Sequence, residues 1–250
     1  KIATLAAAAV AIFLIAFITT ADSSVMFGTV TGEGAFFTIM PHDVMVLVFG
    51  SVFIYAIFAF VMSFRAFWKD IGAESPALSN RRSLVQAFSD ASTLKYLDGG
   101  GNGCGNESER PAPNRRLFHH STFYGFLLCF ASTAVATIYH YFFGWLAPYA
   151  YSSLPVLLGA VGGVGITVGP VGLYVMDRRR DAGLGNNDDH QGMDWAFLMM
   201  LAATGGTGLA LLALRATPLM GSLLAIHLGF VFGFFLTMPY GKFVHGIYRT

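Results

Sequence analysis

The chain has 250 residues, of which 55% are hydrophobic and only 12% are charged, and its formal net charge is +1. The charged share is about half that of a soluble domain, so the composition excludes a disordered chain, a disulfide scaffold and a nucleic-acid binder and indicates a polytopic membrane protein. The two cysteines, Cys104 and Cys129, are too few to build an iron–sulfur cluster or a structural zinc site by themselves.

Six apolar segments have the length of about 17 to 25 residues that crosses a bilayer as a helix. They are residues 2–18, 44–64, 121–143, 154–176, 195–214 and 219–240, and none of them contains Lys, Arg, Asp or Glu. The first segment could also be read as a signal peptide, but it is longer than the usual apolar region of one. We therefore predict an all-α bundle of six transmembrane helices that forms one domain over residues 1–250.

The positions of the basic residues predict how the spans are oriented in the membrane. Every Lys and Arg except Arg215 falls on the side that holds both termini, the segment between spans two and three, and the segment between spans four and five. Positive residues favour the cytoplasmic side, so both termini and the segment 65–118 are expected in the cytoplasm. Within that segment Leu84, Val85 and Phe88 lie on one face of a predicted helix. This face predicts either an interfacial helix or a surface that docks a soluble partner.

Six of the seven histidines lie in or beside the spans, where ionisable groups are functional candidates by default. The alternative for any single one is a hydrogen bond between helices. The predicted topology sorts them into an inner group and an outer group. The inner group is His119, His120 and His245, and the outer group is His42, His140 and His227.

The angular positions of these histidines around their helices, at 100° per residue, indicate which of them can pair. His227 and His245 are separated by five whole turns and share a face, whereas His119 and His140 deviate from a shared face by about 60° and His120 and His140 by about 160°. The separations along the two helices are roughly 31 Å for His119 and His140 and roughly 27 Å for His227 and His245. Since spans three and six are antiparallel, we predict that His140 pairs with His227 and His119 with His245. His42 and His120 are the second choices.

Two histidine pairs stacked across a membrane suit two haems b, with the haem iron held through the same histidines. If histidines fill both axial positions of the iron, no position is left for oxygen to bind, so the expected chemistry is electron transfer. The glycines of span four predict either room for a flat macrocycle or close helix packing. His42 and Asp43 could handle protons at a quinone site, or Asp43 could simply stabilise the start of span two.

Several runs resemble the tricarballylate/citrate utilisation protein B family over essentially the whole chain. These are HHSTFYGFLLCFAST at 119–133, ATIYH at 136–140, APY at 147–149, SLPV at 153–156 and LTMPYGKFVHG at 236–246. The resemblance implies a membrane electron-transfer subunit of the bacterial inner membrane, similar in plan to the cytochrome b gamma subunit of respiratory nitrate reductase. It would pass electrons from a flavin-dependent tricarballylate dehydrogenase to membrane quinone. The four ligands that match the family motif and the phase are His119, His140, His227 and His245.

The family usually carries cysteine-rich, ferredoxin-like clusters, and this sequence has no C-x-x-C-x-x-C run. The iron–sulfur clusters are therefore expected outside this chain, on a segment ahead of Lys1 or on another subunit. The chain is expected to be an electron-transfer component rather than an enzyme with its own substrate site. The alternatives are a tricarboxylate transporter or import accessory without haem, which a cation inside a span would have favoured, and a cofactor-free anchor for a peripheral complex.

Overall fold

In the computed structural model, which describes residues 2–70, 72, 81–93, 113–178, 188–241 and 243, every regular element is a helix. Six helices are long and apolar enough to cross a membrane. They are α1 (Ile2–Thr20), α4 (His42–Asp70), α7 (Pro113–Phe143), α8 (Leu154–Arg178), α9 (Asp188–Leu214) and α10 (Met220–Thr237). The predicted all-α bundle with six spans is confirmed, and the chain is a multi-pass membrane protein.

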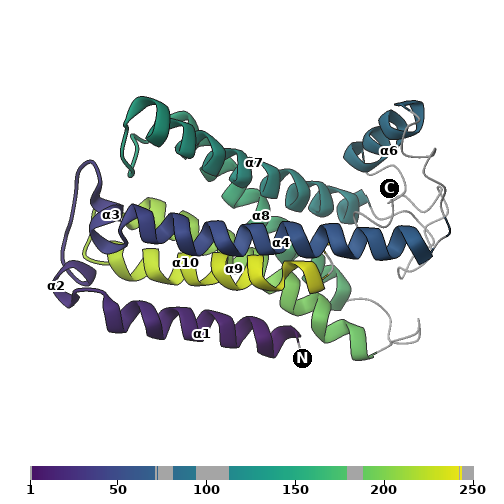
Figure 1. Cartoon of the computed structure of the whole chain (residues 1–250), viewed down its shortest axis with the longest axis horizontal. Helices are drawn as coiled ribbons and strands as arrows, with labels where there is room; N and C mark the ends of the chain where they lie inside the picture. The colour runs from purple at the N-terminus through teal and green to yellow at the C-terminus, as the bar shows by residue number, and fades with distance from the viewer. Residues whose placement is uncertain are drawn as a thin grey trace.

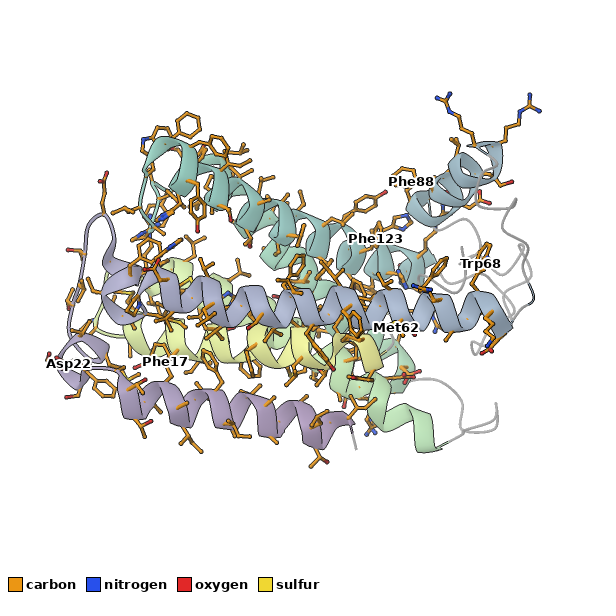
Figure 2. All side chains as sticks on the ribbon, viewed as in Figure 1. Phe17, Asp22, Met62, Trp68, Phe88 and Phe123 are labelled. Carbon is orange, nitrogen blue, oxygen red and sulfur yellow. The ribbon has the colours of Figure 1, made fainter. Side chains whose placement is uncertain are left out.

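The long helices run between two ends of different chemistry (Figure 1). One end, which we call the basic end, holds the end of α4 and the start of α7, with Lys69 and Arg116. The opposite end, which we call the loop end, holds residues 21–41, 144–153 and 215–219. Asp22 lies there (Figure 2) and begins the short helix α2 (Ser23–Met26). Its Oδ1 atom accepts the backbone N–H of Ser24 at 2.9 Å, and hydrogen bonds from Ser24 lower the pKa of this carboxyl group.

The helices pack in chain order from α7 onward, with α7 along α8, α8 along α9, and α9 along α10. Helix α10 also contacts α1 and α4 and therefore lies at the centre of the bundle (Figure 1). Half of the residues in the most apolar window of α10 are buried, against 6% for α4 and none for α7. The corresponding windows of α4 and α7 thus contain almost no fully buried residues.

Glycines let α7 and α8 approach backbone to backbone. A Cβ atom at Gly125 of α7 would lie 2.6 Å from the backbone nitrogen of Ile166, and one at Gly165 of α8 would lie 2.9 Å from Cα of Gly125. Gly162 and Gly169 face α7 in the same way. Such distances are too short for a real side chain, so at these positions the glycines of span four serve close helix packing.

Another face of α8 is apolar and exposed. Its members follow one another at steps of three and four residues: Leu154, Leu157, Val161, Val164, Val168, Val171 and Val175. This spacing places them on one helix face. In a membrane protein such a continuous aliphatic face is in contact with lipid acyl chains, so α8 lies at an edge of the bundle.

Phenylalanine side chains, rather than backbone contacts, link α7 to α4 and α10. Phe126 of α7 contacts Phe234 of α10 with ring centroids 6.0 Å apart, and Phe197 of α9 contacts Phe234 at the same distance. Phe53 of α4 contacts Phe130 of α7 at 5.9 Å. One side of α7 is therefore held tightly by α8, and the other side is bridged by rings.

The segment 65–118, predicted to be cytoplasmic, is partly described. It contains the last residues of α4, the separate helix α6 (Arg81–Thr93) and the first residues of α7. The predicted amphipathic helix is therefore present, and the glycine-rich stretch 99–105 lies outside the described residues. Figure 1 shows α6 beside the first turns of α7, apart from the body of the bundle.

Candidate functional site

Two histidine side chains meet at the loop end. Helix α4 begins at His42, and α7 carries His140 in its last turn. The two imidazole rings stack face to face, with centroids 3.7 Å apart and 15° between their planes. Phe37 contacts both rings edge-on, at 5.1 Å from His42 and 5.5 Å from His140, and Tyr141 contacts them at 5.6 and 5.1 Å. The loop end thus holds an imidazole pair enclosed by aromatic rings.

The stacked geometry limits what this pair can do with one metal ion. An iron atom with two axial imidazoles needs a ring nitrogen pointing at it from each side, with bonds of about 2 Å. Rings stacked face to face cannot both do so as they lie. His42 is therefore placed beside His140 rather than opposite it across an iron. The Nδ1 atom of His140 is buried and has no hydrogen-bond partner among the described residues.

Asp43 follows His42 in the first turn of α4. Its Oδ1 atom lies 3.8 Å from Nδ1 of His42, and its side chain is fully exposed. This distance is too long for a hydrogen bond. A negative charge in the first turn of a helix is stabilising, so the geometry supports the interpretation of Asp43 as a helix-start residue.

His227 of α10 faces α9. Its Nδ1 atom lies 3.2 Å from Oγ1 of Thr207, and that hydroxyl lies 2.6 Å from the carbonyl oxygen of Ala203, to which it donates. Because the hydroxyl hydrogen is used in this way, Nδ1–H of His227 donates to Thr207 and the lone pair is on Nε2. Gly208 makes room for the ring, since a Cβ atom there would lie 3.0 Å from Cε1 of His227.

The histidines of the inner group lie near the start of α7. Nδ1 of His120 lies 2.9 Å from the carbonyl oxygen of Arg116, which can only accept, so Nδ1 donates and Nε2 carries the lone pair. The same ring stacks on Tyr124 with centroids 5.9 Å apart. His119 is half-buried on the same turn. An Nδ1–H bonded to a backbone carbonyl orients a metal-binding histidine, and this feature favours His120 in a way that helical phase did not show.

His245 lies outside the described residues. Helix α10 ends at Thr237 and continues as a single 3₁₀ turn, η2 (Met238–Tyr240), which contains Pro239. The regular 100° step that placed His245 on the face of His227 therefore does not extend to it. The assignment of His245 stays a prediction based on the predicted topology and the family resemblance.

The two histidines of the predicted outer pair have different neighbours. Among the described residues, His140 is joined to His42, a second choice, while His227 lies against α9. The described part of the chain also has no group of three or more His, Cys, Asp or Glu side chains that could hold a metal ion.

Sequence reasoning missed two residues that hold the ring of His227, namely Thr207 and Gly208. In the sequence, the run Gly205-Gly206-Thr207-Gly208 indicates close helix packing. For Gly205 it is packing, since a Cβ atom there would meet the backbone of α8. Thr207 could have been noticed in the sequence as a threonine inside an apolar span, because a hydroxyl group at that depth needs a hydrogen-bond partner.

Comparison with known proteins identifies the family. A family model described as citrate utilization protein B matches residues 1–250. The chain belongs to the citrate utilization protein B family. A curated Escherichia coli protein named citrate utilization protein B is 49% identical over 217 residues, which are 86% of this chain and 56% of that protein. The predicted resemblance is confirmed, and the chain spans about half the length of this relative. No solved structure matches the chain.

Proposed function

We propose that this member of the citrate utilization protein B family is a membrane electron-transfer subunit for the use of citrate or tricarballylate. The observation that carries the proposal is the presence of imidazoles at both ends of one span, with His140 at the loop end of α7 and His119 and His120 at its basic end. A span of this kind is suited to two haems b, one near each membrane surface. A bound haem supplies a reversible one-electron change at iron.

The ligand assignment pairs His140 with His227 at the loop end and His119 with His245 at the basic end. Two features support a fit at the loop end. His227 presents the neutral tautomer with its lone pair on Nε2, and Nδ1 of His140 is buried without a hydrogen-bond partner among the described residues. In addition, no residue in the most apolar window of α7 is fully buried.

The second choices have distinct roles in this proposal. His42 stacks on His140 and orients its ring, so we assign it a positioning role. His120 has the tautomer that ligation through Nε2 requires and competes with His119 for the basic-end haem. Two histidines on each haem would leave no open position at the iron for small molecules, and the bound haems would supply electron transfer.

The basic end is the side proposed to face the cytoplasm of a bacterial inner membrane, because it gathers the Lys and Arg residues. A flavin-dependent tricarballylate dehydrogenase would deliver electrons there through iron–sulfur clusters outside this chain. The part of the curated relative that this chain does not span offers a place for such clusters. Membrane quinone is the proposed partner on the other side of the electron path.

Haem content tests the proposal directly. The full chain, purified from cells supplied with haem precursor, should show a Soret band and two haems b per chain by pyridine haemochrome. His140→Ala and His227→Ala should each remove the same haem and halve the yield, and His119→Ala and His245→Ala should each remove the other. His190→Ala is the matched control, since His190 lies in the first turn of α9, ahead of the apolar part of that span and not in the loop that its sequence indicates. A wild-type chain without a Soret band would overturn the proposal.

The transport alternative is less well supported. An anionic substrate needs a cation at membrane depth, and Arg215 at the loop end is already engaged. Its guanidinium donates to the carbonyl oxygen of Tyr149 and lies 3.7 Å from the ring centroid of Tyr151. Haem-free wild-type protein that binds tricarballylate would favour the transporter over the electron carrier.

A further inference from the structure

Helix α6 is attached to the first turns of α7 by two side chains. The hydroxyl of Tyr124 donates to the carbonyl oxygen of Ser92 at 2.8 Å, and a guanidinium nitrogen of Arg116 donates to the carbonyl oxygen of Thr93 at 3.2 Å. The last carbonyls of a helix have no partner within the helix. These two bonds therefore cap α6 and fix its C-terminal end beside α7 (Figure 1).

The attachment also fixes the depth of α6 in the membrane. Arg116 lies before the apolar part of α7, and Tyr124 lies about two turns further along, inside it. The end of α6 is therefore level with the boundary between the charged and the apolar parts of this span. In a bilayer this level is the boundary between headgroups and acyl chains, where amphipathic helices lie.

The faces of α6 match that environment. Val85 and Phe88 are 61% and 77% exposed, and Figure 2 shows Phe88 on α6, apart from the body of the bundle. On the other face, Nε2 of Gln86 donates to Oδ1 of Asp90 at 2.8 Å. Two exposed apolar side chains on one face are unfavourable in water and favourable among acyl chains.

We propose that α6 lies on the cytoplasmic leaflet and binds anionic phospholipid. Val85 and Phe88 enter the acyl boundary, and the exposed residues Arg81 and Arg82 at the start of α6 bind lipid phosphates. The face with Gln86 and Asp90 then points to the cytoplasm. The proposal uses the cytoplasmic placement of the basic end from the proposed function and is independent of the haem assignment.

Depth measurement with nitroxide labels tests this arrangement in the full chain. In a background of Cys104→Ser and Cys129→Ala, a label is attached at Phe88→Cys or, as the matched control, at Gln86→Cys. Each protein is placed in vesicles of phosphatidylglycerol and phosphatidylcholine. The label at position 88 should be more accessible to oxygen, which concentrates in lipid, than to an aqueous nickel complex, and the label at position 86 should show the reverse preference.

A second arm tests the anionic lipid. Arg81→Gln combined with Arg82→Gln should reduce the equilibrium constant for insertion of the label at position 88 in phosphatidylglycerol, the ratio of inserted to water-exposed label, by about fivefold per arginine. It should leave that ratio unchanged in phosphatidylcholine alone. Equal aqueous access at positions 86 and 88 would overturn the proposal. Protection of position 88 only after a soluble dehydrogenase is added would also overturn it and would assign the apolar face to a protein partner.

Discussion

Replacing Gly208 by alanine should disturb His227 without weakening the helix that carries the glycine. The new Cβ atom would lie 3.0 Å from Cε1 and 3.3 Å from Nδ1 of His227. Ordinary carbon contacts are about 3.5 to 4.0 Å, so the ring must move by several tenths of an ångström. The second-nearest atom, Nδ1, is also the one that lies 3.2 Å from Oγ1 of Thr207, so a shift of the ring strains this hydrogen bond.

The size of the effect follows from the packing. Adding a methyl group where no space exists costs about 1 to 3 kcal/mol, which corresponds to about 5-fold to 150-fold weaker binding of a group held by His227. Alanine is at the same time a better helix former than glycine by about 0.5 to 1 kcal/mol. The fold should therefore survive Gly208→Ala while the loop-end haem is lost or weakly held.

Gly206→Ala is the matched control on the same helix. The nearest neighbour of its Cβ atom would be Cγ2 of Thr167, at 4.0 Å, so the variant gains helix propensity without touching His227. Haem content and the redox titration of the Soret band are measured for both variants beside wild type. Gly208→Ala should lose one of the two haems, and Gly206→Ala should keep both. Identical haem content and identical midpoints in the two variants would refute the placement of His227 as a ligand.

Three further predictions concern the fold. A reporter fused after Thr250 should be active only in the cytoplasm, and Cys104 should react only with reagents that reach the inner face; outer-face labelling in intact cells would contradict this topology. Gly165→Ala should lower the free energy of unfolding by about 1 to 3 kcal/mol, whereas Gly50→Ala, with nothing within 4 Å of its Cβ atom, should not lower it in denaturant titrations. Tyr124→Phe should loosen α6 by about 0.5 to 1.5 kcal/mol, seen as faster amide exchange in α6 alone.

The six spans could be predicted from the sequence because hydropathy identifies the stretch of chain that lies among lipid acyl chains. The ends of the helices could not be predicted in this way. Helix α4 continues past residue 64 to Asp70, and α7 begins at Pro113, ahead of the apolar residues that start at 121. Charged residues such as Arg65 and Arg116 end the apolar segment that hydropathy detects, but arginine is a good helix former. A helix therefore extends beyond its apolar part into the headgroup region.

The grouping of histidines was predictable, and their contacts were not. Hydropathy and charge sorted His42 and His140 to the same end, and the structure places both there. Helical phase then compares residues on one helix only, so it cannot show which neighbour a ring faces. The stacking of His42 on His140 depends on where α4 begins, and the contact of His227 with Thr207 depends on which helix lies next to α10.

The unequal packing of α7 links the fold to the proposed function. On one side, Gly125 and Gly165 bring the backbones of α7 and α8 into contact, so this pair is rigid. On the other side, α7 contacts α4 through rings such as Phe53 and Phe130, 5.9 Å apart, which can change rotamer without moving a helix axis. A flat group bound by His140 would therefore enter between α7 and α4 by displacing side chains. The α7–α8 pair would keep His119 and His140 at a constant distance from each other, as electron transfer between two centres requires.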